Sequence, residues 1–309
     1  MKDWIAAARL RTLPLSISGI IMGSFIARWR ISNEGGFWDW KILALALLVT
    51  LLYQVLSNYA NDYGDGVKGT DLNRTQEAES RAVASGKISA KQMKGAVLLF
   101  AALSLIATFA LLYVSFLPNY MSEFWTFIGL GILCILAAIG YTVGKKPYGY
   151  MGLGDIMVFI FFGLVSVGGS YFLFTKSFSW DILLPASAVG LMSAAVLNLN
   201  NMRDMESDRL SGKKSLALRL GIRNAMIYQI ILLQLPLLLI LIFLGLNNFI
   251  ESKNYYVFIV MILLFPLTKL RRRILLTKDP KELDPFLKQV GLLTLMMSIL
   301  LAFGLNYFG

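Results

Sequence analysis

Long apolar stretches separated by shorter polar segments run along almost the whole chain. Nine of them are close to the ~20 residues that an α-helix needs to cross the ~30 Å hydrocarbon core of a bilayer. They are residues 12–27, 40–60, 95–116, 124–143, 152–175, 180–200, 225–246, 254–269 and 286–308. The pattern predicts an all-α polytopic membrane protein, with nine transmembrane helices in one bundle and a single domain over residues 1–309.

The composition agrees with this class. Of the 309 residues, 57% are hydrophobic and only 15% are charged. That much apolar surface exceeds what a soluble core could bury. The first apolar run follows Arg9 and Arg11 and contains Ser16 and Ser18, which is unlike a cleaved signal peptide. We therefore expect it to be the first span.

The basic residues divide unequally between the two sets of connections. With a cytoplasmic N-terminus, five of the 29 Lys and Arg lie outside, namely Arg28, Arg30, Lys41, Lys176 and Lys253, and the other 24 lie in cytoplasmic segments. Cytoplasmic loops carry the positive excess in membrane proteins. This distribution predicts a cytoplasmic N-terminus and an outside C-terminus. The net charge of +11 is mostly a consequence of this topology, so we expect no nucleic-acid partner.

The longest polar connections share one side. Residues 61–94 and 201–224 both fall on the predicted cytoplasmic side, whereas the outside connections are short. Such an asymmetry is typical of a protein that handles a polar substrate on one face. The sequence therefore predicts an active site at the cytoplasmic side.

Histidine and cysteine are nearly absent from the chain. It has no His, and its one cysteine, Cys134, lies in an apolar run. These counts exclude an internal disulfide, haem or zinc ligation by His, and a histidine general base. The chemistry must rest on other groups.

Two acidic, asparagine-led segments stand at the cytoplasmic ends of apolar spans. The first contains Asn61 and Asp65, and the second contains Asp204 and Asp208. Each pair is four residues apart, so its members share one face of a helix. Carboxylates at a membrane boundary are costly to desolvate unless a cation neutralises them. The four residues therefore predict Mg²⁺ ligands that hold a diphosphate.

Ionisation of an allylic diphosphate also needs cationic side chains around the leaving group. Asp62 is interpreted as a further ligand or as a base. The candidate cations are Arg9 and Arg11 before the first span, Arg81 and Lys87 in the first long connection, Lys145 and Lys146 after Tyr141, and Arg203, Lys213 and Lys214 in the second long connection.

Structural roles compete with these functional ones. Lys and Arg beside a span usually anchor its topology, and Asn or Asp at a helix end is often a cap. Two clusters with the same spacing on one membrane face favour a site over caps. The Gly168-Gly169 pair is interpreted as a position of close helix packing, and no tail-binding residue is assigned among the many aromatic side chains.

Three motifs resemble the UbiA-type intramembrane prenyltransferase superfamily. They are Asn61-Asp62-x-x-Asp65, Tyr141-x-x-x-Lys145-Lys146 and Asp204-x-x-x-Asp208. The resemblance implies a nine-helix bundle whose two Asp-rich motifs bind Mg²⁺ and a prenyl diphosphate. It implies Asn61, Asp65, Asp204 and Asp208 as metal ligands, Asp62, Asp65, Asp204 and Asp208 as catalytic residues, and Lys145, Lys146, Arg81, Lys214 and Arg11 as diphosphate ligands. Where the superfamily often has a further Asp this chain has Gly69, and Asp71 follows two residues later.

Residues 11–16, 61–71 and 146–155 resemble the 1,4-dihydroxy-2-naphthoate polyprenyltransferase branch of that superfamily. This implies transfer of an all-trans polyprenyl group from polyprenyl diphosphate to 1,4-dihydroxy-2-naphthoate in the bacterial cytoplasmic membrane. Loss of CO₂ and diphosphate would give a demethylmenaquinol or demethylmenaquinone for menaquinone biosynthesis. We hypothesise that Asp62 helps to deprotonate a ring hydroxyl. Partners would be the two substrates and the lipid bilayer, without an obligate protein partner.

Alternatives stay open at this point. Within the superfamily, the acceptor could be 4-hydroxybenzoate or another aromatic acid, and haem farnesylation fits the branch motifs less well. A secondary transporter would also hold ionisable groups, but nearer the membrane midplane than the ends of the spans. The cation that binds the naphthoate carboxylate is sought among Arg9, Arg11, Lys145 and Lys146.

Overall fold

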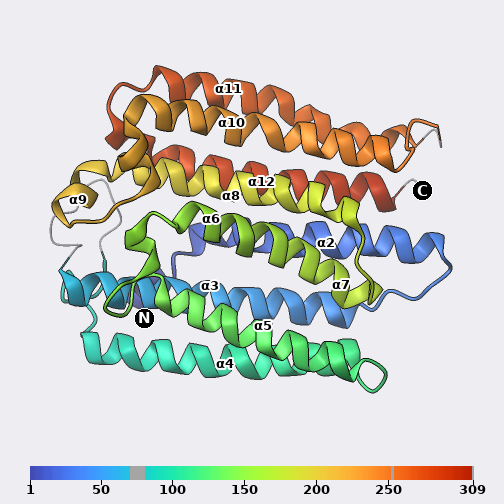
Figure 1. Cartoon of the computed structure of the whole chain (residues 1–309), viewed down its shortest axis with the longest axis horizontal. Helices are drawn as coiled ribbons and strands as arrows, with labels where there is room; N and C mark the ends of the chain where they lie inside the picture. Colours follow the sequence, from blue (N-terminus) through green and yellow to red (C-terminus); the bar gives the residue numbers. More distant parts are fainter. Residues whose placement is uncertain (70–80, 252–253, 308–309) are drawn as a thin grey trace.

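A computed structural model describes residues 1–69, 81–251 and 254–307, and every regular element in them is a helix (Figure 1). The predicted all-α class is confirmed for this part of the chain; Asp71 lies outside it. The elements are α1 (Lys2–Ala8), η1 (Leu10–Thr12), α2 (Leu13–Asn33), α3 (Trp40–Lys68), α4 (Ala90–Phe116), α5 (Met121–Gly140), η3 (Tyr148–Met151), α6 (Gly154–Val158), η4 (Phe159–Gly168), α7 (Gly169–Thr175), η5 (Trp180–Ile182), α8 (Leu183–Arg203), α9 (Met205–Leu210), α10 (Leu216–Leu246), η6 (Tyr255–Leu263), α11 (Leu264–Leu276), η7 (Pro280–Leu283) and α12 (Asp284–Asn306).

Eight helical runs in the described residues are long and apolar enough to cross a membrane, and they match eight of the nine predicted spans. The remaining segment, predicted at 254–269, forms η6 and α11, which have 9 and 13 residues. Basic residues from Lys269 onward shorten its apolar stretch. The chain is an integral membrane protein, and the structure has long apolar helices at eight of the nine predicted spans.

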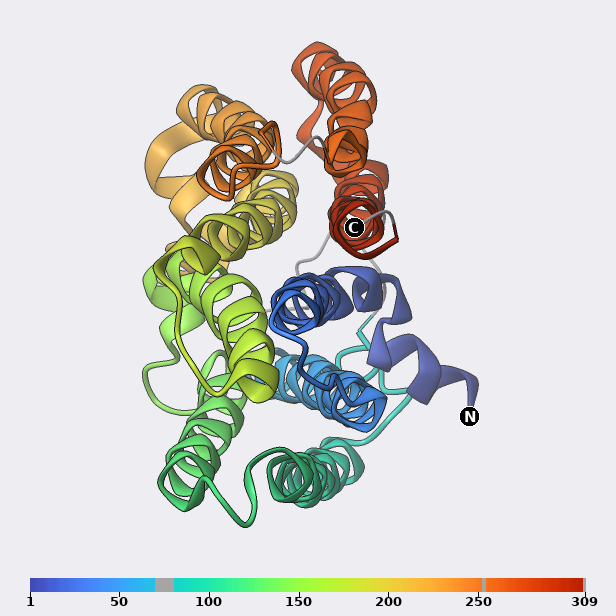
Figure 2. The ribbon, with the colours of Figure 1, turned by 90° about the vertical axis from the view of Figure 1, so that its right-hand side faces the viewer.

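Helix α2 lies in the middle of the bundle, where it packs against α3, α7, η4, α8 and α12 (Figure 2). Its glycines allow this close packing. A Cβ atom at Gly19 would lie 2.2 Å from Ser166 Oγ, and one at Gly23 would lie 2.1 Å from the carbonyl oxygen of Val167. Small residues at such crossings let helices approach without lipid between them.

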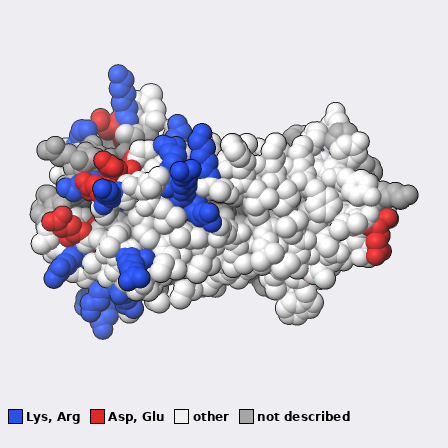
Figure 3. All heavy atoms as spheres, turned by 90° about the horizontal axis from the view of Figure 1, so that it is seen from above, with Lys and Arg blue, Asp and Glu red and all other residues white. Residues whose placement is uncertain are grey.

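The two ends of the bundle differ in charge. Helix α9, the N-terminus and the connection between α5 and α6 lie at one end, and the C-terminus lies at the other (Figure 1). On the face seen in Figure 3, Lys and Arg side chains gather over the end that holds α9. Both acidic motifs lie at this polar end, because α3 finishes there and α8 leads into α9 there.

Candidate active site

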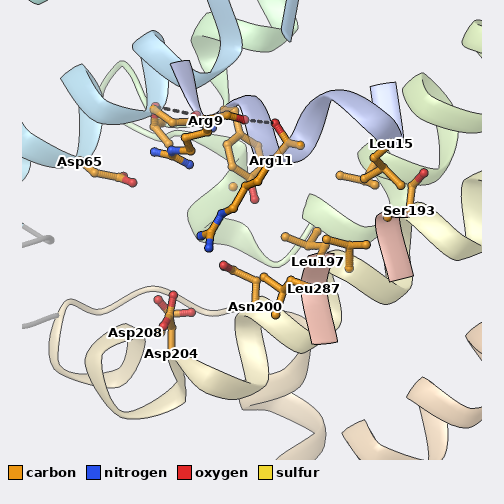
Figure 4. A pocket seen from close by; sticks show the side chains of 18 of the residues that line it. Arg9, Arg11, Leu15, Asp65, Ser193, Leu197, Asn200, Asp204, Asp208 and Leu287 are labelled. Carbon is orange, nitrogen blue, oxygen red and sulfur yellow. Dashed lines mark hydrogen bonds between the residues drawn. The ribbon is translucent and has the colours of Figure 1, made fainter. Parts of the chain in front are cut away.

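A cavity of about 210 Å³ lies at the polar end of the bundle (Figure 4). Both acidic motifs contribute to its walls, together with side chains from η1, α2 and α12. Its lining residues are Arg9, Arg11, Thr12, Leu15, Gln54, Asn61, Asp65, Arg81, Tyr141, Thr142, Gly149, Tyr150, Val158, Phe162, Ser193, Val196, Leu197, Asn200, Asp204, Ser207, Asp208, Ser211, Lys213, Leu287, Lys288 and Gly291.

The first motif forms the last turns of α3. Because the helix continues to Lys68, Asn61 and Asp65 share one face, and both line the cavity as their spacing predicts. The hydroxyl of Tyr150 donates to Asp65 Oδ1 at 2.7 Å, and Arg81 Nη2 lies 3.6 Å from Asp65 Oδ2. The carboxylate of Asp65 is thus held by neighbours from two other connections.

The second motif lies where α8 gives way to α9. Asp204 and Asp208 are buried and line the cavity, and Lys213 Nζ lies 3.3 Å from Asp208 Oδ1. Burial raises the pKa of Asp208, and repulsion from Asp204 adds to this, against the opposing effect of Lys213. Burial would lower the pKa of Lys213, but Asp208 and the other nearby acidic groups outweigh it and raise that pKa. Lys213 therefore keeps its positive charge.

The oxygen donors stand on two walls of the cavity. Asp65 lies on one side and Asp204 and Asp208 on the other (Figure 4). In the described part of the chain, no three acidic side chains come close enough to hold one metal ion by themselves. Carboxylate and amide oxygens suit Mg²⁺, which usually takes one or two carboxylates and completes its shell with water and substrate phosphates. The donor set fits that mode of binding.

The predicted cations fall into two groups. Arg11 and Arg81 line the cavity, whereas Lys145, Lys146 and Lys214 are exposed and do not. A role for these three lysines in diphosphate binding stays a prediction. The cavity instead holds Arg9, Lys213 and Lys288 alongside the two arginines. Lys87 is exposed, and Arg203 is buried beside the cavity rather than in its lining.

Asp62 is turned away from the cavity. Its side chain is buried, with 1% exposed, and its two oxygens accept hydrogen bonds from the backbone of Ala82 at 3.0 Å and Val83 at 2.9 Å. Ala82 and Val83 directly follow Arg81 in the chain, so these hydrogen bonds fix the segment that carries this arginine. Its role as a base stays a hypothesis.

Several lining residues are not among the site residues predicted from the sequence. Tyr150 lies in the connection between α5 and α6, and Lys288 lies in α12. Gln54 and Ser193 are polar residues within the largely apolar helices α3 and α8. A polar residue inside a membrane helix is itself a signal of function, and it could have selected Gln54 and Ser193. Lys288 could be found only by knowing that α12 packs against α2.

A second, mostly apolar cavity of about 660 Å³ adjoins the first. The π-helix η4 contributes to its wall, as do α3 and α5. Gly168 and Gly169 line it, and a Cβ atom at either would meet nothing within 4 Å, so the interpretation of this pair as a packing contact is wrong. Both cavities are lined by Gln54, Asn61, Tyr141, Val158, Phe162 and Leu197.

Comparison with known proteins shows to which family the chain belongs. The sequence model of the UbiA prenyltransferase family matches residues 23–306. The chain belongs to the UbiA prenyltransferase family. Among curated proteins, it is 43% identical to the 1,4-dihydroxy-2-naphthoate octaprenyltransferase of Haemophilus influenzae over 305 residues, covering 99% of this chain and 96% of that one. The protein of the same name in Escherichia coli is 37% identical over 302 residues, with 98% and 94% covered.

The fold agrees with solved structures of this family. A UbiA homologue from Archaeoglobus fulgidus, bound to DMAPP and Mg²⁺, superposes with a TM-score of 0.63 at 15% identity, over 97% of this chain and 99% of that chain. At this identity the likeness concerns the fold alone. The family that the three motifs resemble is confirmed by the match to the family's sequence model.

Proposed function

We propose that this UbiA-family protein transfers a polyprenyl group from polyprenyl diphosphate to 1,4-dihydroxy-2-naphthoate, in menaquinone biosynthesis. The carbon–oxygen bond to the diphosphate breaks, a carbon–carbon bond to the ring forms, and the ring loses its carboxylate as CO₂. The observation that carries this proposal is the joined pair of cavities, one with two acidic walls and cations and the other apolar. The names of the two bacterial relatives support the choice of acceptor.

The acidic walls suit the diphosphate end of the donor. Asn61 and Asp65 on one wall, with Asp204 and Asp208 on the other, would hold Mg²⁺, which neutralises the charge that develops on the departing diphosphate. Lys213 stays charged beside Asp208 and would contact the same group directly. Arg81 is placed to do so from the side of Asp65.

The apolar cavity suits the polyprenyl chain. Its lining includes Phe161, Phe162, Phe172 and Leu164. A hydrocarbon chain can bind against such side chains without desolvating many polar groups. The residues common to both cavities mark the boundary between charged and apolar surroundings. The first carbon of the donor, which is bonded to both the diphosphate and the chain, would lie at this boundary.

We also propose nine membrane spans in the bacterial cytoplasmic membrane, with the N-terminus and the site on the cytoplasmic side. The gathering of Lys and Arg at the site's end of the bundle supports this orientation. In a Cys134→Ala background, a membrane-impermeant maleimide added to intact cells should label Phe37→Cys and spare Lys87→Cys. The reverse pattern would invert the proposed topology.

The reaction is tested with purified protein in detergent, Mg²⁺, a short allylic diphosphate and 1,4-dihydroxy-2-naphthoate labelled in its carboxyl group. Release of one labelled CO₂ for each prenylated product, abolished by EDTA, is expected. Prenylation of 4-hydroxybenzoate in preference to the naphthoate would keep the family and overturn the acceptor. Absence of diphosphate release with either acid would overturn the proposed function as a whole.

A further inference from the structure

One part of the polar cavity is left over once the donor is placed. The acidic walls take the diphosphate, and the apolar cavity takes the chain. The remaining part is lined by Leu15, Ser193, Leu197 and Leu287, which lie together in Figure 4 away from Asp65. Leu197 also lines the apolar cavity, so this part adjoins the place proposed for the first carbon of the donor. Leucine walls with a hydroxyl between them suit a flat hydroxylated ring.

Arg11 borders this part of the cavity. Its side chain extends from η1 across the cavity, and its guanidinium points toward Asn200, on the side of Asp204 and Asp208 (Figure 4). Arg11 Nη1 lies 3.3 Å from Asp284 Oδ2 at the start of α12, the helix that also carries Leu287. The positive charge is therefore placed between the leucine walls and the second acidic motif.

The backbone that presents Arg11 is firmly held. Gln54 Nε2 donates to Thr12 Oγ1 at 2.9 Å, and Ser16 Oγ donates to Gln54 Oε1 at 2.5 Å. Asn58 Nδ2 donates to the carbonyl oxygen of Ala8 at 2.8 Å. Arg9, between α1 and η1, takes a left-handed conformation with φ 50°, which costs free energy for a non-glycine residue and is kept only where surrounding contacts impose it. A pre-positioned guanidinium is what recognition of a planar carboxylate needs.

The charge around Arg11 favours an anion. Asp284 accepts from both Arg11 and the buried Arg203, so one carboxylate is shared between two guanidinium groups. Lys288 lies one helical turn after Asp284 and lines the same cavity. The side of the cavity formed by η1 and α12 therefore carries more positive than negative charge.

We infer that Arg11, together with Lys288, binds the carboxylate of the aromatic acceptor and makes the site selective for an aromatic acid. This assignment rests on the proposed function. It also changes the role suggested for Arg11 by the sequence, from a diphosphate ligand to an acceptor ligand. Of the four cations considered for the carboxylate, Lys145 and Lys146 lie outside the cavity, whereas Arg9 and Arg11 both line it. Arg11 is the one paired with Asp284 on α12, the helix that also carries Leu287 and Lys288.

The test compares acceptor analogues with and without the carboxylate. 1-Hydroxy-2-naphthoate and 1-naphthol are measured as inhibitors against 1,4-dihydroxy-2-naphthoate, with wild type, Arg11→Gln, Arg11→Lys and Lys288→Gln. Loss of a charge-assisted hydrogen bond should raise the inhibition constant of the acid about 10–100-fold in Arg11→Gln. In Arg11→Gln, the inhibition constant of 1-naphthol and the KM of the allylic diphosphate should stay unchanged. Arg11→Lys should raise the inhibition constant of the acid less than Arg11→Gln does. Lys288→Gln should also raise it by a smaller factor, and for the acid alone.

Two controls separate the alternatives. Arg209→Gln removes an exposed arginine outside the cavity and should change none of these constants. Asp284→Asn removes the partner of Arg11 but leaves the guanidinium, so selectivity for the acid should persist even if the rate falls. A raised KM for the allylic diphosphate in Arg11→Gln, or equal losses for acid and naphthol, would overturn the inference. Because wild-type turnover of the naphthoate is measured first, that result would leave the proposed function standing.

Discussion

Arg203 pairs with its own neighbour in the chain, Asp204, through two hydrogen bonds of 2.8 Å from Nε and Nη2. Arg203 is 3% exposed, and its guanidinium also donates to Asn200 Oδ1 at 2.7 Å and to Asp284. A carboxylate held at both oxygens has its orientation set before any ligand arrives. Arg203, which the sequence offered as a candidate diphosphate cation, thus positions Asp204 in the wall of the site.

We expect Arg203→Gln to destabilise the protein and to impair the use of Mg²⁺. Removing one partner of a buried ion pair costs about 3–5 kcal/mol, because the other charges stay buried without it. The variant should unfold at a lower temperature in detergent and need more Mg²⁺ for half-maximal activity. Arg209→Gln, six residues away and exposed, is the matched control. A normal Mg²⁺ titration for Arg203→Gln would show that Asp204 needs no positioning.

Asp208 leads to a prediction about pH. Its pKa is raised by burial and by Asp204, so it binds a proton at a higher pH than an exposed Asp does. Because a metal ligand must be deprotonated, protons should begin to compete with Mg²⁺ at a higher pH than for an ordinary carboxylate. As the pH is lowered, the Mg²⁺ concentration for half-maximal activity should therefore begin to rise at a higher pH than an ordinary Asp ligand would give. A Mg²⁺ requirement that does not change until the usual range of Asp would contradict this.

Spacing along one helix could be predicted from the sequence, and contacts between distant segments could not. The four-residue interval places Asn61 beside Asp65 whatever the rest of the fold does. The choice of Lys213 over Lys214 depends on how the short connection after α9 turns, and Lys288 reaches the cavity only because α12 packs beside α2. Motifs therefore located the acidic walls, and the helix packing determined which cations face them.

Substitution of Asp62 distinguishes a positioning role for this residue from a role as a base. Its oxygens accept from the backbone of Ala82 and Val83, so Asp62→Asn should loosen the segment that carries Arg81. We expect the KM for the allylic diphosphate to rise roughly tenfold, the scale of one charge-assisted hydrogen bond, while the pH dependence of the rate keeps its shape. A fall in kcat alone, with a changed pH profile, would instead support the base. Arg81→Gln should reproduce the effect on the KM of the donor.

The open wall of the apolar cavity gives a prediction about donor length. Gly169 opens α7, its backbone is helical, and a side chain there would enter space that is empty within 4 Å of its Cβ. Gly169→Leu should therefore lower kcat/KM for a long polyprenyl diphosphate at least tenfold and leave dimethylallyl diphosphate, which stays near the polar cavity, almost unaffected. Gly245→Leu is the control, because this glycine also lies in a helix with open space around it but is exposed and outside both cavities. Equal losses with both donors in Gly169→Leu would mean that the chain runs elsewhere.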